Sequence, residues 1–190
     1  MTLSMRSRSW LIFALFVLGI LLTMAVKGVI LPRMELNAQQ YKVEQQNPLT
    51  HDPAILQKYR SKYMGDFSNL SNLFNALPLS RTGMTFQLNS EALTAEILYK
   101  GNTEVLGAEQ VERSLLYNAT AAFALIDNLE GLTFSFENKS YQVKRSAMKL
   151  WYGTGLSGLL EEEMWRTKVQ HRLGDHAYSA RFAQTVLTTE

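Results

Sequence analysis

The most complete letter match to a cofactor motif is the run at residues 153–158, which spells GxGxxG, with Asp175 further along as a candidate ribose-binding acid. That fingerprint binds a dinucleotide only where it follows a strand and opens the helix of a parallel βαβ unit. Here a short predicted helix precedes the glycines, and the residues after them show no strand pattern. We therefore expect a join between a domain and its tail, and no cofactor.

A second motif, SxxK, occurs at Ser146 and Lys149. In penicillin-recognising enzymes the lysine of this motif lies one helical turn from the serine and can activate it. Residues 81–83 read Arg-Thr-Gly and imitate the KTG element of those enzymes, but they precede the serine, and no SDN element is present. The pattern favours a simpler role for Ser146, as the N-cap of a short helix.

The sequence does not contain the residue patterns that metal sites or reactive thiols require. The sequence contains no cysteine, which excludes disulfides, a thiol nucleophile and zinc–thiolate sites. His171 and His176 flank Gly174, and two residues five apart do not share one face of a helix. The three acids at residues 161–163 suit the first turns of a helix, and they lack the alternating oxygens of a calcium loop. We expect no metal site.

Two groups of polar residues remain as candidate binding residues. Lys62 and Asp66 lie at a predicted break between helices. Asp127, Asn128 and Arg145 lie near the ends of predicted elements that can share one edge of a sheet. Helix capping and turn formation are the alternative explanation of both groups.

The distribution of charge argues against a nucleic-acid partner. The formal net charge is +2, but Arg6, Arg8 and Lys27 flank an apolar segment near the N-terminus. From residue 28 onward the chain has 16 basic and 17 acidic residues. The basic excess therefore belongs to the flanks of the apolar segment, and no basic face for nucleic acid is predicted.

Residues 10–31 form an apolar run in which Lys27 is the one charged residue. At 1.5 Å per residue a helix of this length spans roughly 33 Å, enough for the hydrocarbon core of a bilayer. Trp10 at its start suits the membrane interface, and Lys27 near its end can extend its ammonium group to the opposite interface. We expect a transmembrane helix that ends at Leu31 and has the lipid bilayer as its partner.

The predicted orientation places the N-terminus in the cytoplasm. Residues 1–9 carry Arg6, Arg8 and the free amine but no acid, which favours retention of this tail and export of the larger C-terminal part. A core helix is one alternative explanation of the apolar run. Cleavage of the run as a signal peptide, which would make the domain a secreted one, is another, although residues 23–25 fit a cleavage site poorly.

Three segments follow the transmembrane helix. Residues 32–50 are polar, rich in Gln and Asn and without periodicity, and predict a stalk. Residues 51–153 show patterns in the order helix, two strands, helix, two strands, helix. That order predicts an α+β fold of two layers, with helices packed on a small antiparallel sheet. Residues 154–190 have helical spacing and predict a helical C-terminal tail.

Local signals set the expected element boundaries. Asp52 followed by Pro53 predicts a helix start, and Ser68 is a candidate cap of the next helix. Residues 84–89 and 93–99 alternate as strands around a turn at residues 90–91. The helix predicted for residues 107–128 has a regular apolar stripe, composed of Val111, Leu115, Ala119, Ala122, Ile126 and Leu129.

Several segments together carry a family pattern. They read KYMGD at residues 62–66, NA at 118–119 leading into FALIDNL at 123–129, and YQVKR at 141–145, with WYG at 151–153 closing the match. Over roughly residues 55–153 they resemble an uncharacterised bacterial family, domain of unknown function 4825. The resemblance implies an exported domain that is tethered to the membrane by a helix or a lipid, and it brings no catalytic residue with it.

The function that we expect is that of a membrane-anchored extracytoplasmic module of the bacterial cell envelope. It would bind or sense a ligand or protein of the envelope, whose identity the sequence does not give. The reason is that no set of residues converges on a catalytic pattern. The alternative is a small envelope hydrolase in which carboxylates such as Asp66 and Asp127 act as acid and base.

Overall fold

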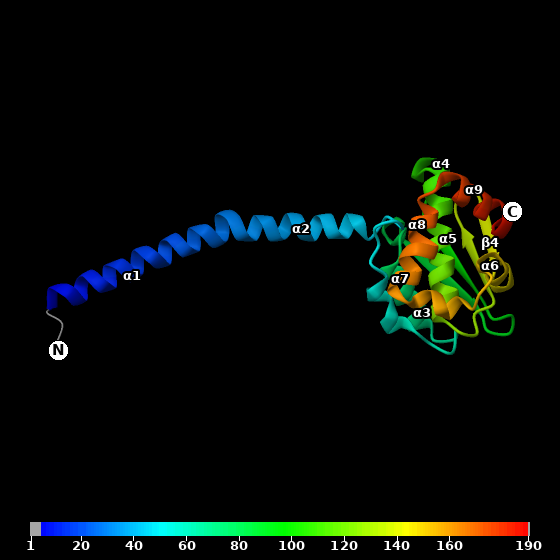
Figure 1. The fold of residues 1–190 in the computed structure, drawn as a ribbon, viewed down its shortest axis with the longest axis horizontal. Helices are drawn as coiled ribbons and strands as arrows, with labels where there is room; N and C mark the ends of the chain where they lie inside the picture. The colour runs from blue at the N-terminus through cyan, green and yellow to red at the C-terminus, as the bar shows by residue number, and fades with distance from the viewer. Residues whose placement is uncertain (1–4, 190) are drawn as a thin grey trace. The chain divides into compact units, whose positions relative to one another are not determined.

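The computed structural model describes residues 5–189, and the chain divides into two units, Met1–Val43 and Glu44–Glu190. The described part of the first unit is helical. It contains α1 (Met5–Ala25), a π-helical turn η1 (Val26–Ile30) and α2 (Leu31–Glu44), which follow one another without a break (Figure 1). Pro32 lacks an N–H group and crowds the preceding turn, and the wider π turn lies directly before it.

One helix in the described part of the chain is long and apolar enough to cross a membrane. It runs over Phe13–Glu44, with a mean hydropathy of 2.4 in its most apolar stretch and no burial there. This agrees with the apolar segment predicted at residues 10–31. Residues 1–4 of the predicted cytoplasmic tail at residues 1–9 lie outside the described residues.

The polar segment at residues 32–50 is divided between a helix and the second unit. It is helical as far as Glu44, although its sequence lacks an apolar stripe. Beyond that point polar side chains attach it to the globular unit. Gln46 Nε2 donates a hydrogen bond to Ser80 Oγ at 2.9 Å, and Gln45 Oε1 accepts one from the N–H of Asp52 at 3.3 Å. Hydropathy does not reveal these contacts, because amide groups make them.

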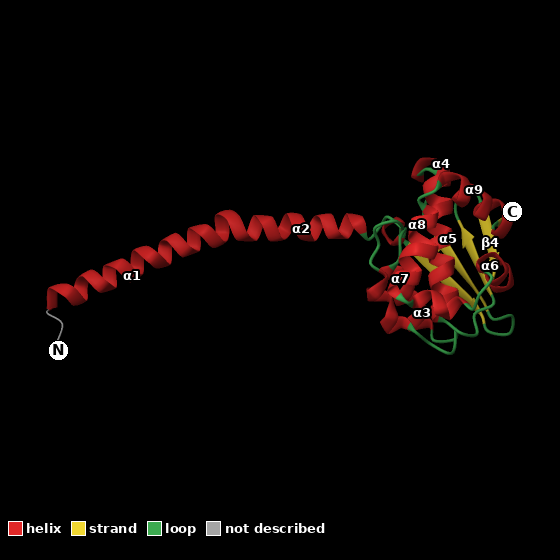
Figure 2. Ribbon diagram, viewed as in Figure 1, coloured by secondary structure: helices red, strands yellow, loops and turns green. Residues whose placement is uncertain are grey.

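The second unit contains a five-stranded sheet in the order β1-β2-β3-β4-β5 (Figure 2). Its strands are β1 (Met84–Asn89), β2 (Thr94–Tyr99), β3 (Gly131–Ser135), β4 (Ser140–Lys144) and β5 (Thr188–Thr189). All neighbours are antiparallel except β2 and β3, which are parallel. The structure thus has the mixed α+β composition that the sequence predicts, with a sheet that is mostly antiparallel.

Two features of the sheet correct the prediction. The sheet is not purely antiparallel, because a helical crossover returns the chain from the end of β2 to the start of β3, so that both strands run in the same direction. Gly131 permits the close pairing there, since a Cβ atom at this position would lie 2.9 Å from Cγ2 of Thr94. The predicted helical tail also contributes a strand, β5, which pairs with β4.

Helices lie on either side of each hairpin in the sequence. The first hairpin follows α3 (Phe67–Ala76) and leads to α4 (Thr103–Leu106) and α5 (Ala108–Leu125); the second leads to α6 (Arg145–Tyr152). The C-terminal part holds α7 (Glu162–Met164), α8 (His171–Leu173) and α9 (His176–Val186). Turns of 3-10 or π-helix are η2 (Pro53–Tyr59), η3 (Ser80–Thr82), η4 (Leu156–Leu160) and η5 (Trp165–Gln170).

The predicted tail at residues 154–190 packs within the second unit. Helix α5 contacts both η4 and α9, and Trp165 of η5 donates a hydrogen bond to the Tyr117 hydroxyl of α5. Consequently α5 is buried on more than the one stripe that the sequence predicts: Leu116 and Tyr117, outside that stripe, have no exposed surface. The core lies between the sheet and these helices.

Three predicted boundaries differ from the structure. Helix α5 ends at Leu125, because the N–H of Ser61 binds the carbonyl of Leu125; Ile126 and Leu129 are buried but lie beyond the helix. The cap of α3 is Asp66 rather than Ser68, since the Asp66 carboxylate accepts the N–H of Asn69 at 2.9 Å. The first hairpin turn extends to Leu93, whose φ of 55° delays the strand to Thr94.

The sheet has one covered and one open face. In β2, Ala95, Ile97 and Tyr99 are buried against the helices. The residues that alternate with them, Thr94 and Glu96 among them, keep part of their surface accessible to solvent. The open face therefore presents polar side chains from neighbouring strands side by side.

Candidate functional site

The two groups of candidate binding residues are brought together by a junction between residues 60–66 and residues 125–130. Ser61 and Ile126 form a parallel bridge, in which the N–H of Asp127 donates to the carbonyl of Ser61 at 3.0 Å. Asn128 Oδ1 then accepts the N–H of Met64 at 2.6 Å. The sequence placed these groups at separate element ends, and their meeting depends on a contact that has no sequence signal.

Four of the five candidate residues, all except Arg145, lie at the edge of this junction. Asp66 is the N-cap of α3, where its carboxylate is occupied by the backbone. Lys62 and Asp127 are exposed to solvent, while Asn128 is partly buried by its bond to Met64. These contacts give Asp66 and Asn128 structural roles. A binding role for Lys62 and Asp127 stays a prediction.

Arg145 lies underneath the junction and is only 6% exposed. Its guanidinium group donates to the backbone carbonyls of Leu129 and Ile126, and it stands over the ring of Phe123 at 5.3 Å. Burial lowers the pKa of Arg145, and the nearby charges of Glu130 and Asp127 act in the opposite direction. The side chain therefore holds the 126–129 turn in shape and is turned away from solvent.

The structure gives Ser146 a different place from the predicted one. It is the second residue of α6, whose N-cap is Lys144 without a side-chain cap bond, so the N-cap prediction for Ser146 is wrong. The reason is that Arg145 donates its N–H to the carbonyl of Glu130, and the helix starts two residues earlier than predicted. Ser146 and Lys149 are both exposed on α6.

The GxGxxG run at residues 153–158 follows α6 rather than a strand. Gly153 has the left-handed conformation that ends this helix, with φ at 65°. The run continues into the 3-10 turn η4. A phosphate cradle would require a strand before the glycines and a helix N-terminus after them, and the structure places neither at residues 153–158.

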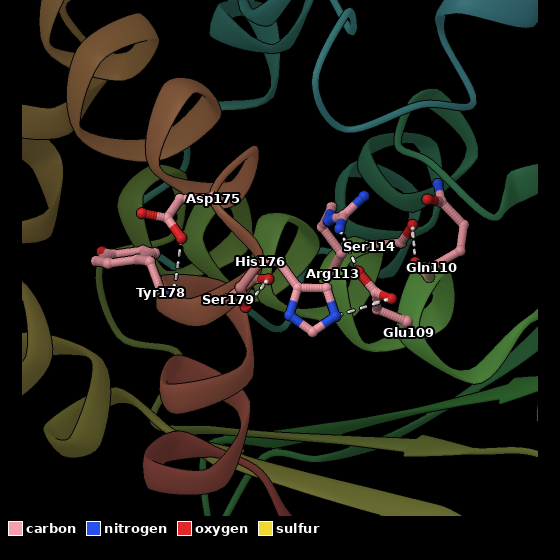
Figure 3. A network of polar contacts seen from close by, with 8 residues as sticks. All are labelled: Glu109, Gln110, Arg113, Ser114, Asp175, His176, Tyr178 and Ser179. Carbon is pink, nitrogen blue, oxygen red and sulfur yellow. Dashed lines mark hydrogen bonds and ion pairs between the residues drawn. The ribbon is translucent and has the colours of Figure 1, made fainter.

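His171 in α8 comes before Gly174, and His176 in α9 comes after it. His176 Nε2 is 3.4 Å from Glu109 Oε2, and Glu109 also accepts from Arg113 at 2.6 Å (Figure 3). This network joins the first turn of α5 to the first turn of α9, where Asp175 caps the N–H of Tyr178. Among the described residues no group of three or more His, Asp or Glu side chains is placed to hold a metal ion.

The open sheet face carries two adjoining shallow depressions that the sequence did not indicate as a site. One has a volume of about 370 Å³ and the other about 570 Å³. Thr94 and Thr133 line both, so the depressions form one continuous surface across the strands. The charged residues that line them are Glu91, Glu96, Glu130 and Lys144. The alternation of apolar and polar residues in each strand indicates which side chains share a face. The register that brings the side chains of different strands together was not predictable from the sequence.

The four principal strands, the junction and Arg145 all lie in one continuous stretch of sequence. Residues 56–146 match the model of a domain of unknown function, DUF4825. This confirms the predicted family resemblance over that segment. Comparisons with curated proteins and with solved structures found no match to the chain.

The DUF4825 segment is completed by residues outside it. Within it, Tyr117 of α5 lies at the centre of a buried polar network whose other members are His51 and Trp165. His51 Nε2 lies 2.8 Å from the carbonyl of Ala76, which can only accept, so Nε2 carries the proton. Nδ1 then accepts from the Tyr117 hydroxyl at 2.8 Å, and that oxygen accepts from Trp165 Nε1 at 3.1 Å. All three side chains are satisfied, which indicates a structural role.

Proposed function

We propose that this protein is anchored in the membrane by its N-terminal helix and that its second unit lies outside the cytoplasm, where it binds a polar ligand of the cell envelope. The ligand surface in this proposal is the open sheet face. The observation that carries the proposal is the continuity of the two depressions through Thr94 and Thr133. A sheet face on which no described element of the second unit packs is available to a ligand, whereas the opposite face is used by the core.

The chemistry of the open face favours a particular class of ligand. Threonine hydroxyl groups and amide groups line it, and three carboxylates stand against the single ammonium group of Lys144. Such a surface accepts more hydrogen bonds than it donates and attracts positive charge. We therefore propose a ligand rich in hydroxyl, amide and amino groups, such as a basic peptide segment, over an anionic or apolar ligand.

Site-specific photo-crosslinking in the membrane tests this surface. A photoreactive side chain in place of Thr94 would lie between the two depressions, and one in place of Asn72 would lie exposed on α3, on the helical side of the sheet. The expected result is an adduct from position 94 that a short basic peptide competes away and an acidic peptide of equal length does not. Equal labelling from both positions would reject the open face as the binding surface.

The proposed orientation has its own test. A reporter that is active only outside the membrane, fused after Glu190, is expected to be active, because Arg6 and Arg8 favour a cytoplasmic N-terminus. Activity of a cytoplasm-only reporter at the same position would reverse the orientation. Recovery of the second unit in the culture medium would instead point to cleavage of the apolar segment.

The hydrolase alternative has less support. It requires two carboxyl groups that share one substrate pocket. Asp66 caps α3, and neither Asp66 nor Asp127 lines either depression on the open face. For this reason we propose binding rather than hydrolysis as the function of the second unit.

A further inference from the structure

Strand β1 has one edge that no other described strand pairs with. Its partner on the other side is β2, and the N–H of Lys100 binds the carbonyl of Gly83 at 3.0 Å. Because hydrogen-bonded pairs alternate along an antiparallel ladder, Thr85, Gln87 and Asn89 also direct their backbone groups toward β2. The N–H and C=O groups of Met84, Phe86 and Leu88 therefore point outward from the sheet.

This edge lacks the devices that keep the free edges of natural sheets from pairing. Such edges usually carry lysine, proline or a bulge, or are covered by another element. The six residues of β1 read MTFQLN, without a charge or a proline, and pair in unbroken register with β2. At the other side of the sheet, by contrast, β5 covers part of β4. An unprotected edge of this length is expected to be covered in the working protein.

Apolar surface accompanies the free backbone groups. Phe67, the first residue of α3, is 51% exposed and lies 6.1 Å, centroid to centroid, from the ring of Phe86. Met84, Phe86 and Leu88 are only partly buried on the same face. A strand added beside β1 would thus extend the sheet and cover these side chains as well.

We propose that β1 pairs with β1 of a second copy of this chain in an antiparallel arrangement, which joins two sheets across a two-fold axis. Centred on Phe86, the pairing places Phe86 opposite Phe86 of the second copy and Met84 opposite Leu88. These residues have the free backbone groups, so each pair exchanges two hydrogen bonds. Apolar side chains meet on the helical face, and Thr85 lies opposite Gln87 on the open face.

Charges at the two ends of β1 select this partner. Arg81 lies just before the strand and Glu91 just after it, and both are exposed. In an antiparallel pair of identical strands, Arg81 of one copy lies near Glu91 of the second copy. At the other end of the pair, Glu91 of the first copy lies near Arg81 of the second. A parallel pair would bring like charges together. The strand is therefore complementary to itself in shape, hydrogen bonding and charge.

A charge-exchange experiment tests both the partner and the register. The mass of the full chain in mild detergent is measured over a range of concentrations, and a dimer is expected. In the double variant Thr85→Lys with Gln87→Lys, the new lysine at position 85 of each copy lies opposite the new lysine at position 87 of the other copy. The repulsion should raise the dissociation constant of the dimer by about tenfold or more. Thr85→Glu with Gln87→Lys places opposite charges in the same pairs and should restore the dimer.

A matched control separates the effect of position from that of charge. Thr154→Lys with Ser157→Lys adds the same charge on exposed residues outside the sheet and should leave the dimer intact. Far-ultraviolet circular dichroism and a thermal unfolding curve confirm that every variant is folded. A wild-type chain that is monomeric at all concentrations overturns the proposal. So does a dimer that is unaffected by the paired lysines, since another surface would then hold it.

Discussion

Asn128 holds Met64 by a hydrogen bond from the N–H of Met64 to its side-chain oxygen, although the two residues are 64 positions apart in the chain. The bond links the loop before α3 to the turn after α5, and Met64 itself is buried. The candidate residues on both segments are therefore held together by this side-chain amide in addition to the bridge between Ser61 and Ile126. This relationship explains why two groups that seemed separate in the sequence lie at one place on the surface.

Replacement of Asn128 by Ala should destabilise the second unit by about 1–3 kcal/mol, because it leaves the buried N–H of Met64 without an acceptor. Urea unfolding of a fragment spanning residues 44–190 measures this change. Asp127→Ala, on the exposed neighbour, should stay within about 0.5 kcal/mol. Equal effects of the two substitutions would show that the Asn128–Met64 bond contributes no stability.

Replacement of Arg145 by Lys keeps the charge but loses the guanidinium fork that binds two carbonyl groups. We expect a loss of about 1–3 kcal/mol in the free energy of unfolding, since one of these buried carbonyls is left without a donor. Lys149→Arg, on the exposed side of the same helix, is the matched control and should be neutral. A stability like that of the wild type in Arg145→Lys would show that the bonds from the guanidinium group to the turn contribute no stability.

Truncation of leucine on two helices tests the packing of α5. Leu115 has no exposed surface, whereas Leu150 on α6 is 86% exposed. Leu115→Ala should cost about 2–5 kcal/mol, the range for large-to-small changes in a core. Leu150→Ala should change stability by no more than about 0.5 kcal/mol. Thermal and urea unfolding report both, and comparable losses would mean that α5 does not face the core as described.

Acidification should weaken the fold through His51. Burial lowers the pKa of His51 below 6.5, against smaller opposite effects of the Ala76 carbonyl and Asp52. The unfolded chain then binds the proton at a higher pH than the folded one, so this stability is complete above pH 6.5 and is lost as the pH falls through the folded pKa. Urea midpoints between about pH 7.5 and 5.5 should show the decline.

Two histidine variants identify the source of that decline. His51→Gln removes the titrating group and should flatten the dependence on pH, at the expense of overall stability. His171→Gln, on an exposed residue, should leave the dependence as in the wild type. A slope that survives in His51→Gln would assign the effect to other groups.

The sequence predicts the elements well where a pattern repeats locally. The apolar helix, the alternation in β1 and β2, and the stripe from Val111 to Ala122 all appear in the structure. Contacts between distant segments were not predictable. The bond from Met64 to Asn128 and the burial of Arg145 each depend on a contact between polar atoms that are distant in the sequence. Such contacts produce no periodic pattern of residues.

The errors in the prediction have the same origin. Ser68 and Ser146 are suitable caps by residue type, but Asp66 and the backbone of Arg145 take up the relevant positions first. The parallel pairing of β2 with β3 was missed because an antiparallel hairpin is the local solution for neighbouring strands, and the choice between the two depends on where α5 packs. The open sheet face became visible only when the register was known.

The parallel pairing also has a consequence for the order in which the chain folds. Each hairpin, β1 with β2 and β3 with β4, joins strands that are close in sequence and can form within microseconds. Pairing of Thr94 with Gly131 must wait until the whole of α5 has folded back, so it carries the largest loop-closure cost among the four main strands. We therefore expect the meeting of the two hairpins to be the slow step of folding, and Gly131 allows it because a Cβ atom there would lie 2.9 Å from Cγ2 of Thr94.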